Sequence, residues 1–439
     1  LIDCGLHQER AHQERNWLPL PIPPSSIDGV LLTHAHLDHS GYLPKLVKDG
    51  FRGRVYCTGA TADVAGIVLR DAAAVQEEDA AFKKKRHARE GRKSPRPVVP
   101  LYSTQDAENA CRSIRSVNYN TLVPFTDGVS ASWHDAGHII GSSMIRITVN
   151  GAAPRSVLFS GDVGRWSKPV LRDPSLFDEA DYVVVESTYG NRVHEILDKI
   201  DAMLVEAIKS TAERGGKVII PAFAVERSQE LLYRLNSLLA AGRIPNMPIF
   251  LDSPMAISVT EVYRKHLELL DEEVNGLIRA GMSPFDLPGL RSTRKREESK
   301  NINDFRGPAV IIAGSGMCTG GRIKHHLAHG IDHAENTVLF IGYQAAGTLG
   351  GQIAGGALEV RIFGRFFPVR ARIEKIEGFS GHADKNELLK WLGALRRPPT
   401  RVFVTHGEPD AAFALADAIK TEYGWDTVVP EYGNIAELE

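Results

Sequence analysis

Residues 30–39 read VLLTHAHLDH, an apolar run that leads directly into three histidines and an aspartate. A short apolar run that ends in polar residues is typical of a buried strand followed by a loop. On a tight turn after such a strand, His34 and His36 can point to one side, and Asp38 and His39 to another. Neutral imidazole and carboxylate are ligands of a borderline cation such as Zn²⁺. The stretch therefore predicts ligands for two adjacent metal ions. A His-rich surface loop is the weaker interpretation, because the cluster follows a hydrophobic strand and not a low-complexity tract.

One loop cannot close two metal sites, so further ligands are expected downstream at strand ends. The sequence offers three: His138 between glycines in AGHIIGS, Asp162 at the end of LFSGD, and His406 at the end of VFVTHG. Each taken alone is more often a turn residue or a satisfied core polar group. Together, all in loop positions after apolar runs, they complete a ligand set.

Composition limits the class of protein. A chain of 439 residues is long enough for two or three domains, each with its own core. With 43% apolar and 24% charged residues and a formal net charge of −2, it has the balance of an ordinary globular protein. Any nucleic-acid surface must therefore be a local patch, since the chain as a whole carries almost no net charge.

No apolar run approaches the length of a membrane span, and no secretory signal pattern is present, so we expect no membrane association. The four cysteines are scattered without a C-x-x-C pair, which favours a reducing, cytoplasmic setting over a disulfide framework. The chain begins without Met inside an apparent strand, Leu1-Ile2-Asp3-Cys4, so we expect residues to precede Leu1.

Apolar strand-like runs alternate with amphipathic helical runs, which predicts α/β layers. The expected strands are residues 29–33, 156–159, 182–186, 218–221, 248–251, 309–313, 337–341 and 401–405, and the expected helices are 41–48, 226–240, 321–328 and 385–395. Two charged stretches interrupt this pattern. Residues 83–96 form a basic run that is a candidate for steering RNA, and residues 286–305 suggest an exposed helix or loop. For both, a solvated face is the simpler interpretation.

The series HAHLDH, GH, SGD and a late TH resembles the metallo-β-lactamase superfamily. That resemblance implies an αββα sandwich with metal ions at the strand ends. It implies that His34, His36 and His138 hold one zinc ion, that Asp38, His39 and His406 hold the other, and that Asp162 bridges them. Asp3 matches the first acidic motif and is expected to orient a ligand rather than to bind metal. Manganese is an alternative that the same ligand set accepts.

Two later motifs, VVVESTYG with Glu186 and GFSGHAD with His382, enclose nearly two hundred residues with their own strand–helix alternation. This pattern resembles the β-CASP nucleases, in which a second α/β domain is inserted into the metallo-β-lactamase sequence. The resemblance implies a metallo-β-lactamase domain at 1–190 and 373–439 and a β-CASP domain at 191–372. A His at position 406 is similar to the RNA-processing members of that group.

The stretches AGSGMCTGGR and IGYQAAGTLG resemble the bacterial and archaeal members, which are similar to the nuclease subunit of the eukaryotic mRNA 3′-end cleavage machinery. The resemblance implies a ribonuclease that binds single-stranded RNA, cuts endonucleolytically and has 5′→3′ exonuclease activity as an option. A homodimer is compatible with it. Gly351 departs from the pattern, because many relatives carry Arg after GTLG.

The resemblance makes Asp38, Glu186 and His382 the catalytic residues. Two cations can activate water and offset the charge that develops on a scissile phosphate. The leaving ribose oxygen then needs a proton, for which His382 is the candidate general acid, with Glu186 orienting its imidazole. The structural alternatives are a helix-cap histidine at 382 and a buried Glu186 satisfied by backbone N–H groups.

Candidate substrate-binding residues lie at two strand-to-helix junctions. Ser315, Thr319 and Arg322 occupy the glycine turn GSGMCTGGR, and Arg227 occupies PAFAVERSQ, where amides and hydroxyls can approach phosphate. Helix capping explains the second junction equally well.

Two other functions stay open in the sequence. One is a small-molecule hydrolase of the thioesterase or lactamase type, which would need no inserted domain. The other is a catalytically silent RNA-processing subunit, which would be expected to lose metal ligands.

Overall fold

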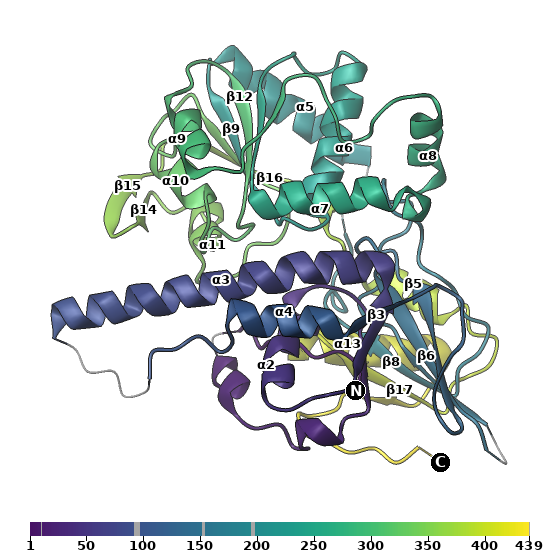
Figure 1. Ribbon diagram of the computed structural model, residues 1–439. Helices are drawn as coiled ribbons and strands as arrows, with labels where there is room; N and C mark the ends of the chain where they lie inside the picture. The colour runs from purple at the N-terminus through teal and green to yellow at the C-terminus, as the bar shows by residue number, and fades with distance from the viewer. Residues whose placement is uncertain (10, 92–96, 152–153, 195–197, 439) are drawn as a thin grey trace. The chain divides into compact units, whose positions relative to one another are not determined.

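The computed structural model describes residues 1–9, 11–91, 97–151, 154–194 and 198–438 (Figure 1). The chain divides into two compact units. Unit 1 comprises Leu1–Gly164, Asp173–Arg192 and Asp384–Glu439, and unit 2 comprises Arg165–Arg172 and Val193–Ala383. The domain boundaries predicted after residues 190 and 372 stay a prediction.

Unit 1 is built on two sheets. A three-stranded parallel sheet has the order β1-β2-β3, and a seven-stranded mixed sheet has the order β18-β17-β8-β7-β6-β5-β4. In the larger sheet β4 to β7 are antiparallel neighbours, whereas β7, β8, β17 and β18 run parallel. The strands are β1 (Gly29–Leu31), β2 (Arg54–Thr58), β3 (Ile114–Val117), β4 (Val123–Thr126), β5 (Val129–Asp135), β6 (Ser143–Val149), β7 (Arg155–Phe159), β8 (Tyr182–Glu186), β17 (Arg401–Thr405) and β18 (Thr427–Val428).

Side chains from both sheets meet in one core. Leu31 of β1 packs in the same buried cluster as Ala131 and Trp133 of β5 and Ile145 of β6. Ala131 and Trp133 are two residues apart, so strand periodicity turns both to the same face. Helices cover the outer faces, which gives the predicted αββα sandwich. They are α1 (Leu37–Ser40), α2 (Leu43–Lys48), α3 (Gly59–Glu90), α4 (Thr104–Ser113), α12 (Lys385–Leu392) and α13 (Pro409–Tyr423).

Unit 2 is an open parallel sheet of order β11-β10-β12-β9-β13-β16 with helices on both faces. Its strands are β9 (Lys217–Pro221), β10 (Ile249–Asp252), β11 (Leu290–Ser292), β12 (Ala309–Ala313), β13 (Thr337–Phe340) and β16 (Arg372–Lys375), and β14 (Glu359–Ile362) with β15 (Arg365–Pro368) forms a separate hairpin. Its helices are α5 (Asp198–Glu213), α6 (Arg227–Ala240), α7 (Pro254–Lys265), α8 (Glu272–Arg279), α9 (Arg296–Asp304), α10 (Ile323–Ala328) and α11 (Leu349–Ala354).

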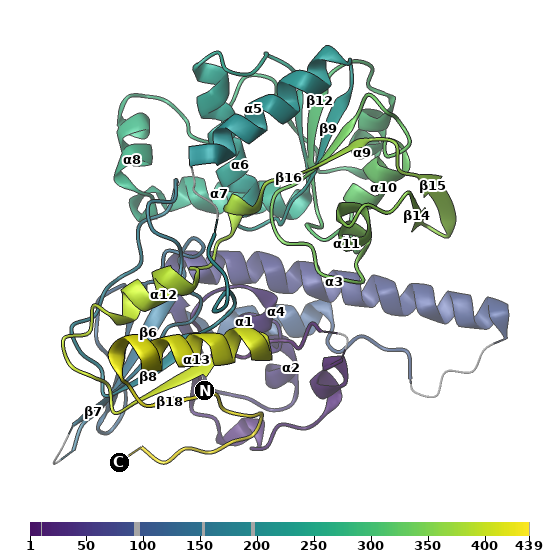
Figure 2. The ribbon, with the colours of Figure 1, turned by 180° about the vertical axis from the view of Figure 1, so that it is seen from behind.

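Two apolar cores lie on opposite faces of this sheet. Val218 and Ile220 of β9 pack in the cluster that contains buried residues of α5, α6 and α7. Ile219, between them, packs in the cluster that contains residues of α9, α10 and α11. Figures 1 and 2 show α5 and α6 on one side of β9 and β12, and α9 and α10 on the other. A central strand that is buried on both faces explains why its sequence is a continuous apolar run without alternation.

The segment Arg165–Arg172 belongs to unit 2, although it follows β7 in the sequence. Buried Lys168 is paired with Glu226 and, at 2.8 Å, with Glu230 at the start of α6. Arg165 donates a 2.9 Å hydrogen bond to the carbonyl of Gly378. Charges this deeply buried must be paired, so these contacts fix the segment against α6 and the turn after β16.

The expected elements are present with ends shifted by no more than three residues, but one expectation is wrong. Leu1–Cys4 is not a strand: only Ile2 forms an isolated bridge to Leu31, because Asp3 turns the backbone to φ 53°. Residues 83–90 are the end of the long helix α3, while 92–96 of the basic run lie outside the described residues. The stretch 286–305 contains β11 and α9.

Among the described residues, no helix has both the length and the apolar character that a membrane span requires.

One buried carboxylate organises the C-terminal ends of the unit 2 strands. Asp252 at the end of β10 is 0% exposed. Its Oδ1 accepts a hydrogen bond from Arg322 at 2.6 Å and another from Thr293, and its Oδ2 accepts from Ser299 at 2.6 Å and His326 at 2.7 Å. Burial acts to raise the pKa of Asp252, but these donors outweigh it and lower the pKa to about 2. The ionised carboxylate therefore stabilises unit 2.

We expect Asp252→Asn to lower the free energy of unfolding of unit 2 by about 2–3 kcal/mol at pH 7, since each unit of pKa difference is worth ~1.4 kcal/mol. The pKa is lower in the folded state, so this contribution is complete above ~pH 4 and is lost as the pH falls towards 2. Chemical denaturation of wild type and Asp252→Asn should show a smaller difference in unfolding free energy at pH 3 than at pH 7. Asp304→Asn, an exposed change on α9, should leave stability unchanged. An equal loss of unfolding free energy in Asp252→Asn at both pH values would contradict the stabilising role of the ionised carboxylate.

Candidate metal centre

Loops that follow the strands of unit 1 bring the seven predicted metal ligands together. Tight backbone turns present several of them. Gly161, with φ 53°, precedes Asp162, and a Cβ at that glycine would lie 2.9 Å from the Thr33 Cβ. Gly137, with φ 65°, precedes His138. The glycines of the GH and SGD motifs are therefore explained by a left-handed conformation that other residues rarely adopt.

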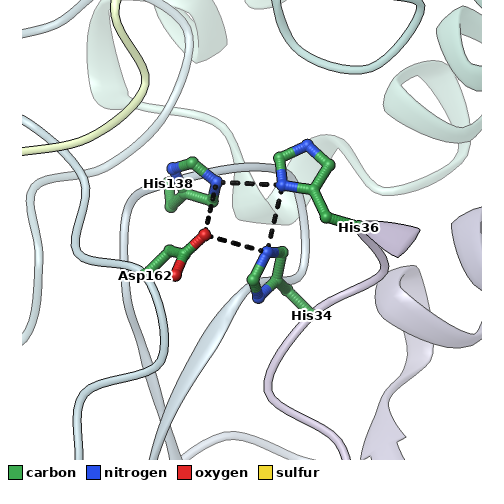
Figure 3. A group of neighbouring side chains, drawn as sticks. All are labelled: His34, His36, His138 and Asp162. Carbon is green, nitrogen blue, oxygen red and sulfur yellow. Dashed lines mark hydrogen bonds and ion pairs between the residues drawn. The ribbon is translucent and has the colours of Figure 1, made fainter. Parts of the chain in front are cut away.

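Three imidazoles and one carboxylate form the first group (Figure 3). His36 Nδ1 lies 3.0 Å from His34 Nε2 and 3.2 Å from His138 Nε2. Asp162 Oδ2 lies 3.3 Å from His34 Nε2 and 3.5 Å from His138 Nε2. All four ligand atoms lie within 4.8 Å of one another.

Asp38, His39 and His406 form the second group. His39 Nε2 lies 3.1 Å from His406 Nε2, which in turn lies 3.6 Å from Asp38 Oδ2. Asp162 Oδ1 lies 3.3 Å from His39 Nε2 and 3.4 Å from His406 Nδ1. The two oxygens of Asp162 thus face different groups, which is the arrangement that a bridging carboxylate needs.

The first group fits a tetrahedral cation. Zinc binds imidazole nitrogen at ~2.0–2.1 Å, so neighbouring ligand atoms of a tetrahedral site lie about 3.3 Å apart. The four separations given above for the first group run from 3.0 to 3.5 Å. Imidazole nitrogens that face one another so closely cannot all act as donors, and a shared cation accounts for their convergence.

Electrostatics differ between the groups. Burial lowers the pKa of His34, and the neighbouring His39 lowers it further, which favours the neutral imidazole that a metal requires. Burial also acts to lower the pKa of His39, but Asp162 and Asp3 outweigh it and raise that pKa well above its usual value. Asp162 and Asp38 likewise outweigh burial at His406 and raise its pKa to about 9. A cation at the second group would take over the charge that these carboxylates otherwise balance with protons.

Asp3 lies behind the ligands. Its Oδ2 is 2.6 Å from His39 Nδ1 and accepts a 2.8 Å hydrogen bond from the Thr33 hydroxyl, while its Oδ1 accepts a 2.7 Å hydrogen bond from the Thr33 amide. These contacts fix the ring of His39, leaving its Nε2 directed at the second group. Sequence reasoning assigned nothing to Thr33, although its position directly before His34 was a signal: its hydroxyl is 3.0 Å from His34 Nδ1.

Glu186 is buried at the end of β8. Its Oε1 accepts a 2.6 Å hydrogen bond from the amide of Val163, the residue after Asp162, and its Oε2 accepts from Thr188 Oγ1 at 2.5 Å. The carboxylate therefore holds the loop that carries Asp162. Thr188 was also missed by sequence reasoning, and its hydroxyl lies 3.4 Å from His406 Nδ1.

His382 lies in unit 2, in the turn between β16 and α12. Its amide donates to Ser380 Oγ at 3.2 Å, and its carbonyl lies 3.0 Å from His194 Nε2. The helix cap of α12 is not His382 but Asp384, which forms a capping box with Glu387.

The predicted substrate-binding residues also lie in unit 2. Ser315 Oγ and Thr319 Oγ1 are 3.3 Å apart in the glycine turn. Arg322 donates to Asp252 and to the carbonyls of Thr293 and Arg294. Arg227 donates to Glu226 at 3.1 Å and to the carbonyl of Ile341 at 3.0 Å. Both guanidinium groups therefore stabilise unit 2 itself, and their contact with substrate stays a prediction.

Gly351, where the resemblance led us to expect Arg, lies in the first turn of α11. A Cβ at this position would lie 2.3 Å from the carbonyl oxygen of Ala345. The backbone here leaves no room for any side chain, so the missing Arg is a feature of the local fold.

Three family models match the chain. A metallo-beta-lactamase superfamily domain matches residues 1–187, a Beta-Casp domain matches 228–353, and a Zn-dependent metallo-hydrolase RNA specificity domain matches 367–430.

Curated relatives match along nearly the whole chain. Ribonuclease TTHA0252 of Thermus thermophilus is 40% identical over 94% of this chain and 89% of its own length. An RNase J-like protein of Methanocaldococcus jannaschii is 30% identical over 100% of this chain and 94% of its own. Transcription termination factor FttA of Methanosarcina mazei is 32% identical over 95% of this chain, which spans only 64% of that relative. A solved structure of a protein of unknown function from Enterococcus faecalis V583 shares the fold, with a TM-score of 0.51 at 12% identity over 92% of this chain and 80% of that one.

Removing one imidazole of the first group should release a divalent ion. We expect His138→Ala to lower the metal content measured by mass spectrometry after dialysis by about one equivalent, because the remaining ligands cannot complete a four-coordinate site. His134→Ala is a matched control: this histidine lies on β5, with its ring 2.8 Å from Ser132 Oγ and outside both groups. Full metal content in His138→Ala would contradict the assignment.

Proposed function

The chain belongs to the β-CASP group of the metallo-β-lactamase superfamily, and on that basis we propose that it is a two-zinc ribonuclease that hydrolyses phosphodiester bonds of single-stranded RNA. The observation that carries the two-metal part is the position of Asp162, whose two oxygens face two different ligand groups at 3.3–3.5 Å. The zinc ions would activate water and offset the negative charge that develops on the scissile phosphate.

RNA as the substrate is supported by two likenesses. Residues 367–430 match a domain described by its RNA specificity, and a relative of 40% identity is named as a ribonuclease. We propose endonucleolytic cleavage, with 5′→3′ exonuclease activity as a second mode. Zinc is favoured over manganese because imidazole nitrogen outnumbers carboxylate in the donor set.

The protein's own residues divide the remaining work. Asp3 fixes the ring of His39, and Glu186 fixes the loop of Asp162 through the Val163 amide. Asp38 would hold the second ion together with His39 and His406. His382 is the proposed general acid that protonates the leaving ribose oxygen. The Glu186 contacts support a positioning role for that residue.

The two alternative functions, a silent processing subunit and a small-molecule hydrolase, have less support. A silent processing subunit would not need all seven ligand positions to be occupied by competent side chains that converge in two groups. A thioesterase or lactamase would leave the inserted parallel sheet of unit 2 without a purpose.

The test is cleavage of a 5′-labelled single-stranded RNA beside DNA of the same sequence, each with and without chelator. We expect metal-dependent cleavage of RNA, and a rate lowered by about 10²–10⁴-fold in His382→Ala with unchanged metal content, since proton transfer by a positioned group contributes that much. His333→Ala, an exposed histidine of the same unit, is the control and should cut normally.

Full activity of His382→Ala would remove it from the mechanism while leaving the nuclease intact. Wild-type protein that is loaded with zinc and cuts neither nucleic acid, but hydrolyses a thioester, would replace the proposed function with the small-molecule alternative.

A further inference from the structure

The β14–β15 hairpin of unit 2 exposes two phenylalanines. Phe363 is 55% exposed and Phe366 is 65% exposed. The opposite face of the hairpin is not available to a ligand, because Val360 and Ile362 are fully buried in the unit 2 core and Phe367 packs on it. Figures 1 and 2 show the hairpin beside α10 and α11. The hairpin is thus anchored on one face and presents aromatic rings on the other.

The turn of this hairpin carries an unfavourable residue. Phe363 and Gly364 form the two-residue loop, with φ of 50° and 83°. Both values are positive, as in a type I′ turn, which favours Asn, Asp or Gly at its first position. A bulky side chain with positive φ is strained, and the partial burial of Phe363 offsets only part of the strain energy. Backbone strain that packing does not offset is typical of functional positions.

One cationic side chain lies beside each ring, and an imidazole also packs on the ring of Phe363. Lys324 Nζ of α10 lies 5.1 Å from the centroid of the Phe363 ring, and the His325 ring lies 4.6 Å from it at 33°. Arg361, the cross-strand neighbour of Phe366, has its guanidinium carbon 5.8 Å from that ring. Arg365 follows the turn directly and is exposed. Exposed aromatic faces interleaved with positive charge suit a polyanion whose bases are free to stack.

We propose that this hairpin surface, made of Lys324, His325, Arg361, Phe363, Arg365 and Phe366, binds single-stranded RNA outside the metal centre. Unpaired bases stack on the two phenylalanine rings, while the lysine and arginines contact phosphates. Duplex RNA does not fit, because paired bases have no free face to stack. The inference rests on the proposed function and extends it by naming a second contact between the enzyme and its substrate.

The test compares binding by the full-length, zinc-loaded protein and two variants. Phe363→Asn removes a ring and places a favoured residue at the turn, and Phe366→Thr removes the other ring while keeping a strand-forming residue. The probe is a phosphorothioate single-stranded RNA, followed by fluorescence anisotropy. We expect each variant to bind about fivefold to tenfold more weakly and the double variant more weakly still, because a lost base stack has about that effect.

Controls separate stacking from charge and from folding. Phe413→Ala removes an equally exposed ring from α13 and should bind RNA normally. Inorganic polyphosphate, which has no bases, should bind wild type and both phenylalanine variants alike. The melting temperature of Phe363→Asn should equal or exceed that of wild type, since Asn relieves the backbone strain of the turn. If Phe363 had only a structural role, the variant would melt at a lower temperature than wild type.

Three results would overturn the hairpin site. Unchanged RNA affinity in the double variant, with wild type still cutting RNA, would refute this site and leave the proposed function intact. Equal loss of polyphosphate binding would refute base stacking. Loss of a dimer in the variants, measured by light scattering, would reassign the surface to contact between copies of the chain. If wild type neither binds nor cuts RNA, the proposed function itself fails.

Discussion

The carboxylate of Asp162 is the constraint on which unit 1 is organised. A buried negative charge is costly unless it is paired, and here imidazoles approach both oxygens from opposite groups. The imidazoles that reach it come from three separate stretches of chain, which follow β1, β5 and β17, so the sandwich must be folded before the site exists. Glu186 and Asp3 then hold the loop and one ring in place. The fold and the metal site are consequences of the same packing.

The convergence of the candidate ligands in two groups was predictable because each residue leaves a local signal in the sequence. An apolar strand that ends in His or Asp, next to a glycine, can be recognised without knowing its partners, and parallel strands bring such ends together. The same logic placed the eight strands that it predicted within two residues of their observed ends, but it missed others, among them β5 and β6 of the larger unit 1 sheet. It failed at Leu1–Cys4, where the positive φ of Asp3 reduces an apparent strand to a single bridge. It also missed α3 altogether, because a helix whose second half is exposed has no continuous apolar stripe to mark it.

Residue type was a poorer guide to role where tertiary contacts decide. The contact of Arg322 and Arg227 with phosphate was predicted from their strand-to-helix junctions and stays a prediction, but the sequence did not reveal that their guanidinium groups also donate to Asp252, Glu226 and backbone carbonyls. Gly351 could not be judged from sequence, because only the carbonyl of Ala345 reveals that a side chain has no space. Thr33 and Thr188 went unnoticed, since a hydroxyl gains meaning only from the ring beside it.

Anomalous diffraction at the zinc absorption edge, from crystals grown with zinc, tests the bridging role of Asp162 directly. Two peaks ~3.5–4 Å apart are expected, each contacted by a different oxygen of Asp162. One peak would be surrounded by His34, His36 and His138, and the other by Asp38, His39 and His406. A single ion, or two ions bound through the same oxygen of Asp162 or without it, would contradict the bridging arrangement.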